Sequence, residues 1–193
     1  MEQTISHGCG FAHEAEKPTE VLSDEHRVIE RVLGVLQRLT AVPVNPSLEQ
    51  WRKALDFFRH FADQCHHFKE EKVLFPALEE HGIPREGGPI GMMLAEHEEG
   101  RGHVRSMIDA VEQVAKGNGA ASTTLLDHAR AYVTLLREHI QKEDDILFRM
   151  ADEVIPEEEQ RRILKDFENH EAEEMGAGAH EKYLGIAHEL EAA

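Results

Sequence analysis

The 193-residue sequence has no long apolar run, few cysteines and few basic residues, and each shortage excludes a class of protein. No run approaches the roughly 20 apolar residues that span a bilayer, and the N-terminus continues into polar sequence rather than the apolar core of a signal peptide. We therefore expect a cytoplasmic protein. The two cysteines, Cys9 and Cys65, do not make a disulfide framework.

Acidic residues outnumber basic residues. The chain has 21 Lys and Arg against 38 Asp and Glu, a formal net charge of −17 at pH 7. Such a charge repels phosphate backbones and anionic lipid headgroups. We therefore expect neither nucleic acid nor a membrane surface as a partner, and we expect most of the acidic side chains on solvated helix faces.

The alternating pattern of strands is also missing, and apolar residues recur at helical spacing over four long stretches. Short connections rich in Pro or Gly separate these stretches. Four long helices with short connections predict an all-α fold, an antiparallel up-down four-helix bundle. The predicted helices cover about residues 19–40, 48–80, 89–116 and 122–152.

The rest of the chain is assigned around this bundle. Residues 1–18 show no sustained period and are predicted to be an irregular N-terminal arm. Residues 19–193 are predicted to be one domain with its core at 19–152 and a C-terminal helical extension. In the extension, a short helix is expected after Pro156 and another over about 170–189, which the glycines near residue 177 weaken.

Histidine is abundant, at fourteen residues, and two segments repeat one order of side chains. Residues 66–75 read His-His-Phe-Lys-Glu-Glu-Lys-Val-Leu-Phe, and residues 139–148 read His-Ile-Gln-Lys-Glu-Asp-Asp-Ile-Leu-Phe. In both, a lysine follows the first histidine by three positions, acidic residues follow by four and five, and Leu-Phe follows by eight and nine. The repeat predicts that both segments do the same task.

The repeated segments combine imidazole and carboxylate on one helix face, because residues four apart lie one turn apart. A lone buried histidine is more often a hydrogen-bonded core residue than a ligand. Here, however, all four predicted helices place a histidine on the apolar stripe, and buried carboxylates without a partner are strongly unfavourable. A metal site explains both observations. The predicted ligands are His26, His66, Glu70, His97, His139 and Glu143.

The chemistry of this donor set limits the metal. Imidazole with carboxylate and no thiolate is typical of iron or manganese, and each of two carboxylates can bridge a pair of ions. A structural zinc site more typically shows cysteines at short spacing, which this chain lacks.

The order of these residues, from His26 through His66-x-x-x-Glu70 and His97 to His139-x-x-x-Glu143, resembles the hemerythrin-like HHE cation-binding domain. The resemblance covers about residues 19–152 and includes the Leu-Phe after each pair. It implies two non-haem iron ions bridged by the two carboxylates and an oxo or hydroxo group. It also implies dioxygen, nitric oxide or peroxide as the small ligand.

The sequence departs from the oxygen-carrying hemerythrins at one ligand position. Those proteins have a second histidine one turn after the ligand on the third helix, where this chain has Arg101. His103 is six residues beyond His97 and faces another direction. His60 and His128 are alternative partners or replacement ligands.

The register of the repeated segments leaves a second alternative. The oxygen-carrying family members would match His67 with Glu71, and Asp144 five residues after His139. The internal Leu-Phe repeat favours His66 with Glu70, and Glu143, because one spacing then explains both segments. This choice leaves His67 and Glu71 at the flank of the site.

The resemblance implies a protein that reversibly binds or senses oxygen or a related small oxidant. The first alternative is an enzyme, a di-iron oxidase, peroxidase-like scavenger or oxygenase, because an open coordination position suits activation as well as binding. The second is iron storage, iron delivery or the repair of iron–sulfur clusters. Bacterial repair proteins share the two Leu-Phe-anchored pairs but have an additional N-terminal domain with cysteine, which the 17 residues before the first helix would not supply.

Overall fold

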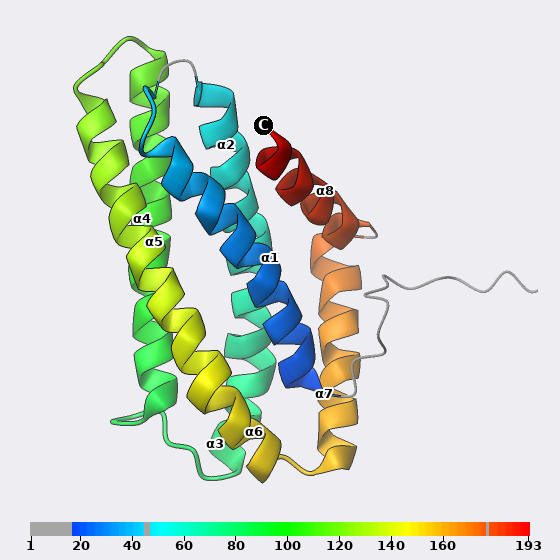
Figure 1. Cartoon of the computed structure of the whole chain (residues 1–193). Helices are drawn as coiled ribbons and strands as arrows, with labels where there is room; N and C mark the ends of the chain where they lie inside the picture. The colour runs from blue at the N-terminus through cyan, green and yellow to red at the C-terminus, as the bar shows by residue number, and fades with distance from the viewer. Residues whose placement is uncertain (1–16, 45–46, 177) are drawn as a thin grey trace, which may run out of the picture.

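The computed structural model describes residues 17–44, 47–176 and 178–193, and these residues form helices and short connections without a strand. Four long helices run alternately up and down (Figure 1), so the predicted all-α bundle is confirmed. Almost all of the predicted irregular arm, residues 1–16, lies outside the described residues. Within the described part, no helix is both long and apolar enough to cross a bilayer.

The four long helices keep close to the predicted bounds. Two of them change from α-helix to the wider π-helix partway along their length. The first is α1 (Pro18–Leu39); the second joins α2 (Leu48–Phe57), η2 (Phe58–His67), η3 (Glu70–Leu74) and α3 (Phe75–Glu80); the third is α4 (Pro89–Ala115); the fourth joins α5 (Ala121–Lys142), η4 (Glu143–Leu147) and α6 (Phe148–Val154).

The C-terminal extension consists of α7 (Glu157–His170), η5 (Glu171–Met175) and α8 (Ala179–Ala192). The single helix expected over 170–189 is interrupted, because Gly176 and Gly178 both have φ of +81°, a positive value that glycine adopts readily and that ends helices. The extension turns back along the bundle (Figure 1), where α7 contacts α1 and η3, and α8 contacts α1 and α2. One flank of the bundle is therefore covered by a further layer.

The apolar core is divided into two clusters along the bundle axis. The larger cluster contains the C-terminal half of α1 and residues that include Trp51, Phe58 and Tyr132. The smaller cluster contains Leu22 and Phe75 with the start of α4, α6 and part of α7. On each long helix, buried polar residues lie between the two apolar groups. This polar layer contains His26, His66, His67, Glu70, His97, His139 and Glu143, each at most 4% exposed.

The π-helical segments coincide with the polar layer. Segment η2 ends at His67, η3 begins at Glu70, and η4 begins at Glu143. π-Helical turns are rare and are frequently found at functional sites, because the wider turn changes which residues face inward. The helices therefore depart from regular geometry at the level where the polar side chains meet.

Candidate metal centre

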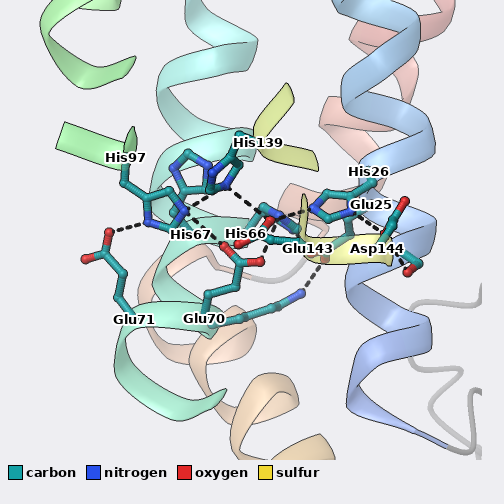
Figure 2. A network of polar contacts seen from close by, with 12 residues as sticks. Glu25, His26, His66, His67, Glu70, Glu71, His97, His139, Glu143 and Asp144 are labelled. Atoms are coloured by element: carbon teal, nitrogen blue, oxygen red, sulfur yellow. Dashed lines mark hydrogen bonds and ion pairs between the residues drawn. The ribbon is translucent and has the colours of Figure 1, made fainter. Parts of the chain in front are cut away.

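The six residues predicted as ligands meet in the buried polar layer (Figure 2). They come from all four long helices. Together with His67, they form two adjacent groups of imidazole and carboxylate atoms, and within each group the donor atoms lie within 4.8 Å of one another. One group is His26, His66, Glu70 and Glu143, and the other is His67, Glu70, His97 and His139.

Two carboxylates connect the groups. Glu70 places Oε1 3.5 Å from His66 Nε2 and Oε2 3.4 Å from His97 Nε2. Glu143 Oε2 is 3.3 Å from His26 Nε2 and 3.1 Å from His139 Nε2. Each carboxylate therefore faces one imidazole on its own helix and one on a neighbouring helix.

His67 is the member that the sequence reasoning left at the flank. Its ring is buried and stacks on the His97 ring, with centroids 3.8 Å apart and planes 14° from parallel. Consecutive residues of an α-helix point about 100° apart, so His66 and His67 would not both face one cluster in regular geometry. Both lie at the end of the π-helical segment η2, where the turn is wider. The π-helical turn, which the periodicity of the sequence does not reveal, directs His67 into the site.

A carboxylate faces Nδ1 of each imidazole and accepts a hydrogen bond from four of the five. His66 Nδ1 donates to Glu25 at 2.9 Å, and His139 Nδ1 donates to Glu96 at 2.9 Å. A carboxylate on Nδ1 fixes the tautomer, so that Nε2 is left as a lone-pair donor toward the interior. Two further pairs are His26 with Asp144 (2.9 Å) and His97 with Glu71 (2.8 Å), whereas Nδ1 of His67 faces Asp63 at 3.6 Å, beyond hydrogen-bond distance.

The acids of the alternative register lie outside the donor groups, as outer partners, which we define as residues that hydrogen-bond to Nδ1 of a donor histidine. Glu71 and Asp144, which that register would have used as ligands, instead accept hydrogen bonds from His97 and His26. Arg101 lies beside these acids. Its Nε donates to Asp63 at 2.7 Å, and a terminal nitrogen donates to Glu71 at 2.5 Å. Arg101 thus neutralises two carboxylates that face imidazoles.

The Leu-Phe that follows each repeated pair packs against the rings. Phe148 stacks on His26 with centroids 5.4 Å apart, and Phe75 stacks on His97 at 5.9 Å. Leu74 and Leu147 belong to the smaller apolar cluster. The repeated Leu-Phe therefore closes one side of the polar layer against water.

Burial and mutual charge oppose each other at the two central carboxyls. Burial raises the pKa of Glu70, and the Glu143 carboxylate raises it further, well above its ordinary value. Burial acts in the same direction on Glu143, but His139 and His26 outweigh it and hold the pKa of Glu143 well below the ordinary value. Burial and the Glu143 carboxylate therefore both disfavour a negative charge on Glu70 in the metal-free chain. A cation beside both carboxyls would favour the ionised form instead.

The imidazoles divide in a similar way. Burial lowers the pKa of His66 to about 3, although the hydrogen bond to Glu25 acts in the opposite direction. Burial also disfavours charge on His139, but the carboxylates of Glu143 and Glu96 outweigh it and raise its pKa to about 9. At neutral pH, His66 is thus a neutral donor, whereas a metal would displace a proton from His139.

The unmatched atoms in this layer fit a cation. Buried polar groups are normally hydrogen-bonded. Among the described residues, however, Nε2 of His26 and His66, both ring nitrogens of His67, and all four carboxylate oxygens of Glu70 and Glu143 are buried without a hydrogen bond. Donors at about 2 Å from one ion lie up to about 4 Å apart, which is close to the spacing within each group. The donor set therefore fits one cation in each group.

The other histidine candidates lie elsewhere. His60 Nδ1 donates to the carbonyl of Asp56, and His103 and His128 contact each other through their Nδ1 atoms at 2.9 Å. None of these three belongs to a donor group found among the described residues. Cys65 is buried as expected and also lies outside those groups.

Comparison with known proteins agrees with this geometry. Residues 17–151 match the family model of the hemerythrin HHE cation binding domain. Rv1995, an uncharacterised protein of Mycobacterium tuberculosis, is 24% identical over 176 residues, which cover 89% of this chain and 68% of that protein. The iron-sulfur cluster repair protein YtfE of Yersinia pestis is 34% identical over 92 residues, 45% of this chain and 40% of that protein. No solved structure matches the chain.

Proposed function

Because the chain belongs to the hemerythrin HHE cation-binding domain family, we propose that it holds two non-haem iron ions and binds or senses a small oxidant beside them. The candidate ligands are dioxygen, nitric oxide and peroxide. One observation carries the proposal, the convergence of buried, unmatched imidazole and carboxylate atoms into two adjacent groups that share Glu70.

The donor set suits iron or manganese, and the family favours iron. The two groups contain imidazole and carboxylate donors, and the buried thiol of Cys65 belongs to neither. Such donors suit iron and manganese, whereas thiolates select zinc and copper. Glu70 and Glu143 each face imidazoles of both groups, as bridging ligands would.

The two groups differ in their number of imidazoles. One contains His26 and His66, and the other contains His67, His97 and His139. In this assignment His67 supplies the fifth imidazole that the sequence lacks at position 101. If Glu70 and Glu143 are counted for both groups, the group with two imidazoles has four donors and the other has five, so we assign the small ligand to the side with four.

The chain's own residues orient the donors and exclude water. Carboxylates accept hydrogen bonds from Nδ1 of four of the five histidines, and Phe75 and Phe148 cover two of the rings. When bound, iron supplies the redox chemistry that small oxidants require. A dry and rigid donor set favours reversible binding, because it limits proton access to the ligand.

The test starts from protein made in iron-replete medium, in which metal analysis should give about two irons per chain. A single zinc ion would contradict the proposal. The diferrous protein is then exposed to air and followed by absorption spectroscopy. A long-lived adduct that reverses under argon supports binding or sensing, whereas rapid oxidation with turnover of peroxide or an added substrate would indicate an oxidase, peroxidase-like enzyme or oxygenase.

The similarity to YtfE favours iron–sulfur cluster repair as a second candidate function. The similar segment covers less than half of either protein, so the function is tested directly. The iron-loaded chain is incubated with an oxidatively damaged iron–sulfur protein and a reductant. Recovery of the cluster's absorption, which a His66→Ala variant should not support, is the expected result under this candidate. No recovery above free ferrous iron would reject it.

A further inference from the structure

Lys69 and Lys142, the lysines three positions after His66 and His139, make equivalent contacts in the two repeated segments. Lys69 Nζ donates to Glu25, which accepts the Nδ1 proton of His66. In the other half, Lys142 donates to Glu96, which accepts the Nδ1 proton of His139. The lysine three positions after the histidine therefore holds the carboxylate that orients that histidine.

The two lysines lie in different surroundings. The side chain of Lys142 is 31% exposed, so water solvates part of its charge. The side chain of Lys69 is 0% exposed and makes a second ion pair, with Glu171 of η5. A buried ammonium needs nearby acceptors in place of water. Glu171 provides one of them from outside the four-helix bundle.

The extension is fixed beside this contact. The ring of His170 stacks on Phe68 with centroids 3.5 Å apart, and His170 Nε2 donates to the carbonyl of Gln64 at 3.1 Å. Both partners lie within three residues of His66 or His67. The family match ends at residue 151, so these contacts come from a part of the chain that the match does not include.

We propose that Glu171 and Lys69 are positioning residues of the metal centre, through which the C-terminal extension fixes His66. The carboxylate of Glu171 keeps Lys69 between two acids. Lys69 then holds Glu25 against Nδ1 of His66, and the ring presents Nε2 to the donor group that contains His26. This inference rests on the proposed function, because it assigns a role toward the iron on that side.

The first experiment compares Glu171→Gln with Glu191→Gln. Glu191 pairs with Arg31 and also ties the extension to the bundle, so each variant removes one charge and one such ion pair. Both proteins are loaded with two ferrous ions without oxygen and challenged with excess ferrous chelator. Outer partners typically change metal affinity about 10- to 100-fold. We expect Glu171→Gln to accelerate one phase of iron loss about tenfold, and Glu191→Gln to change neither phase.

Lys142→Met serves as the internal control, because it disturbs the counterpart on His139 and should accelerate the other phase. Equal rates in Glu171→Gln and Glu191→Gln would overturn the proposal. Acceleration of both phases by Glu171→Gln would also overturn it, since general loosening of the fold acts on both groups of donors.

A second experiment uses the metal-free chain and so separates this inference from the proposed function. In protein with ¹⁵N-labelled histidine, the Nδ1 proton of His66 should exchange with solvent about tenfold faster in Glu171→Gln than in Glu191→Gln. Equal exchange overturns the positioning role, whereas a wild-type chain that holds fewer than two irons contradicts the function alone. Lys69→Met leaves the buried charge of Glu25 without its ammonium partner, so it is combined with Glu25→Gln, and this double variant should accelerate the same phase of iron loss.

Discussion

The first two long helices of the bundle and the last two form two helix pairs with equivalent residues at equivalent contacts. Glu25, His26, His66, Lys69, Glu70 and Glu71 on the first pair correspond to Glu96, His97, His139, Lys142, Glu143 and Asp144 on the second. In each pair the glutamate before the first histidine holds the second histidine, and the last acid of each set holds the first histidine of the other pair.

Among the metal donors, the two helix pairs differ at one position. His67 follows His66, whereas Ile140 follows His139 and belongs to the apolar core. They also differ outside the donor groups, where Glu171 contacts Lys69 and water reaches Lys142. A nearly symmetric scaffold therefore yields two unequal donor groups through one substitution and one added segment.

The largest effect on iron binding is expected when the carboxylate that connects the two donor groups is removed. Glu70→Gln removes the carboxylate that both groups share, and both irons should bind at least about 100-fold more weakly, beyond the effect of an outer partner. Metal analysis after desalting measures this. Glu80→Gln, an exposed change on the same helix, is the control. Loss of a single iron would show that Glu70 serves only one group.

The next comparison separates the adjacent histidines. His66→Ala removes a donor from the group with two imidazoles, and His67→Ile places at residue 67 the side chain found at its counterpart, Ile140. Each variant should retain about one iron per chain by metal analysis, because each disrupts one group. If His66→Ala retains both irons while His67→Ile retains none, His66 is not a ligand and the alternative register is correct.

The pH dependence of the metal-free chain should have opposite signs at the two counterpart histidines. The raised pKa of His139, about 9, stabilises the fold below pH 6.5, and that contribution is lost as the pH rises through 9. The lowered pKa of His66, about 3, makes stability fall as the pH drops from 6.5 toward 3.

Denaturant unfolding measures these slopes. Between pH 6.5 and 9, the free energy of unfolding should fall by up to about 3 kcal/mol in the wild type and by clearly less in His139→Gln. His66→Gln should instead flatten the slope on the acid side. A wild-type chain whose stability rises from pH 6.5 to 9 would contradict the assigned charge of His139.

The smallest effect concerns Arg101, whose place the oxygen-carrying proteins give to a histidine. Arg101→Gln leaves Asp63 and Glu71 without their shared cation, but both remain partly solvated. Iron on the side with three imidazoles should bind about 3- to 10-fold more weakly, less than the 10- to 100-fold typical of outer partners, because water solvates part of both acids when Arg101 is removed. Competition with a chelator measures the change, and Arg105→Gln on the same helix is the control. No difference between the two variants would assign Arg101 to the surface alone.

The fold follows from the sequence because helical periodicity is a local property. Apolar residues spaced for an α-helix define all four long helices, and Gly or Pro mark their connections. The break at Gly176 and Gly178 is sharper than the sequence predicts, since glycine indicates a weakened helix but not the positive φ of both residues.

The six predicted donors follow from the sequence for a similar reason, because each lies on the buried stripe of a helix. His67 does not, since its inward direction depends on the π-helical turn. The outer partners Glu25 and Glu96 do have a signal in the sequence, because each directly precedes a predicted ligand in the same Glu-His dipeptide. Glu171 has no such signal, as only tertiary packing brings it to Lys69.

The division of the apolar core has a consequence for how the molecule opens. Each of the two apolar clusters can pack by itself, and in the metal-free chain the layer between them contributes unmatched polar atoms instead of cohesion. Amide hydrogen exchange should then show the smaller cluster opening at lower free energy than the larger one. Bound metal would join the two clusters into one cooperative unit, so that after iron loading both clusters open with the same free energy.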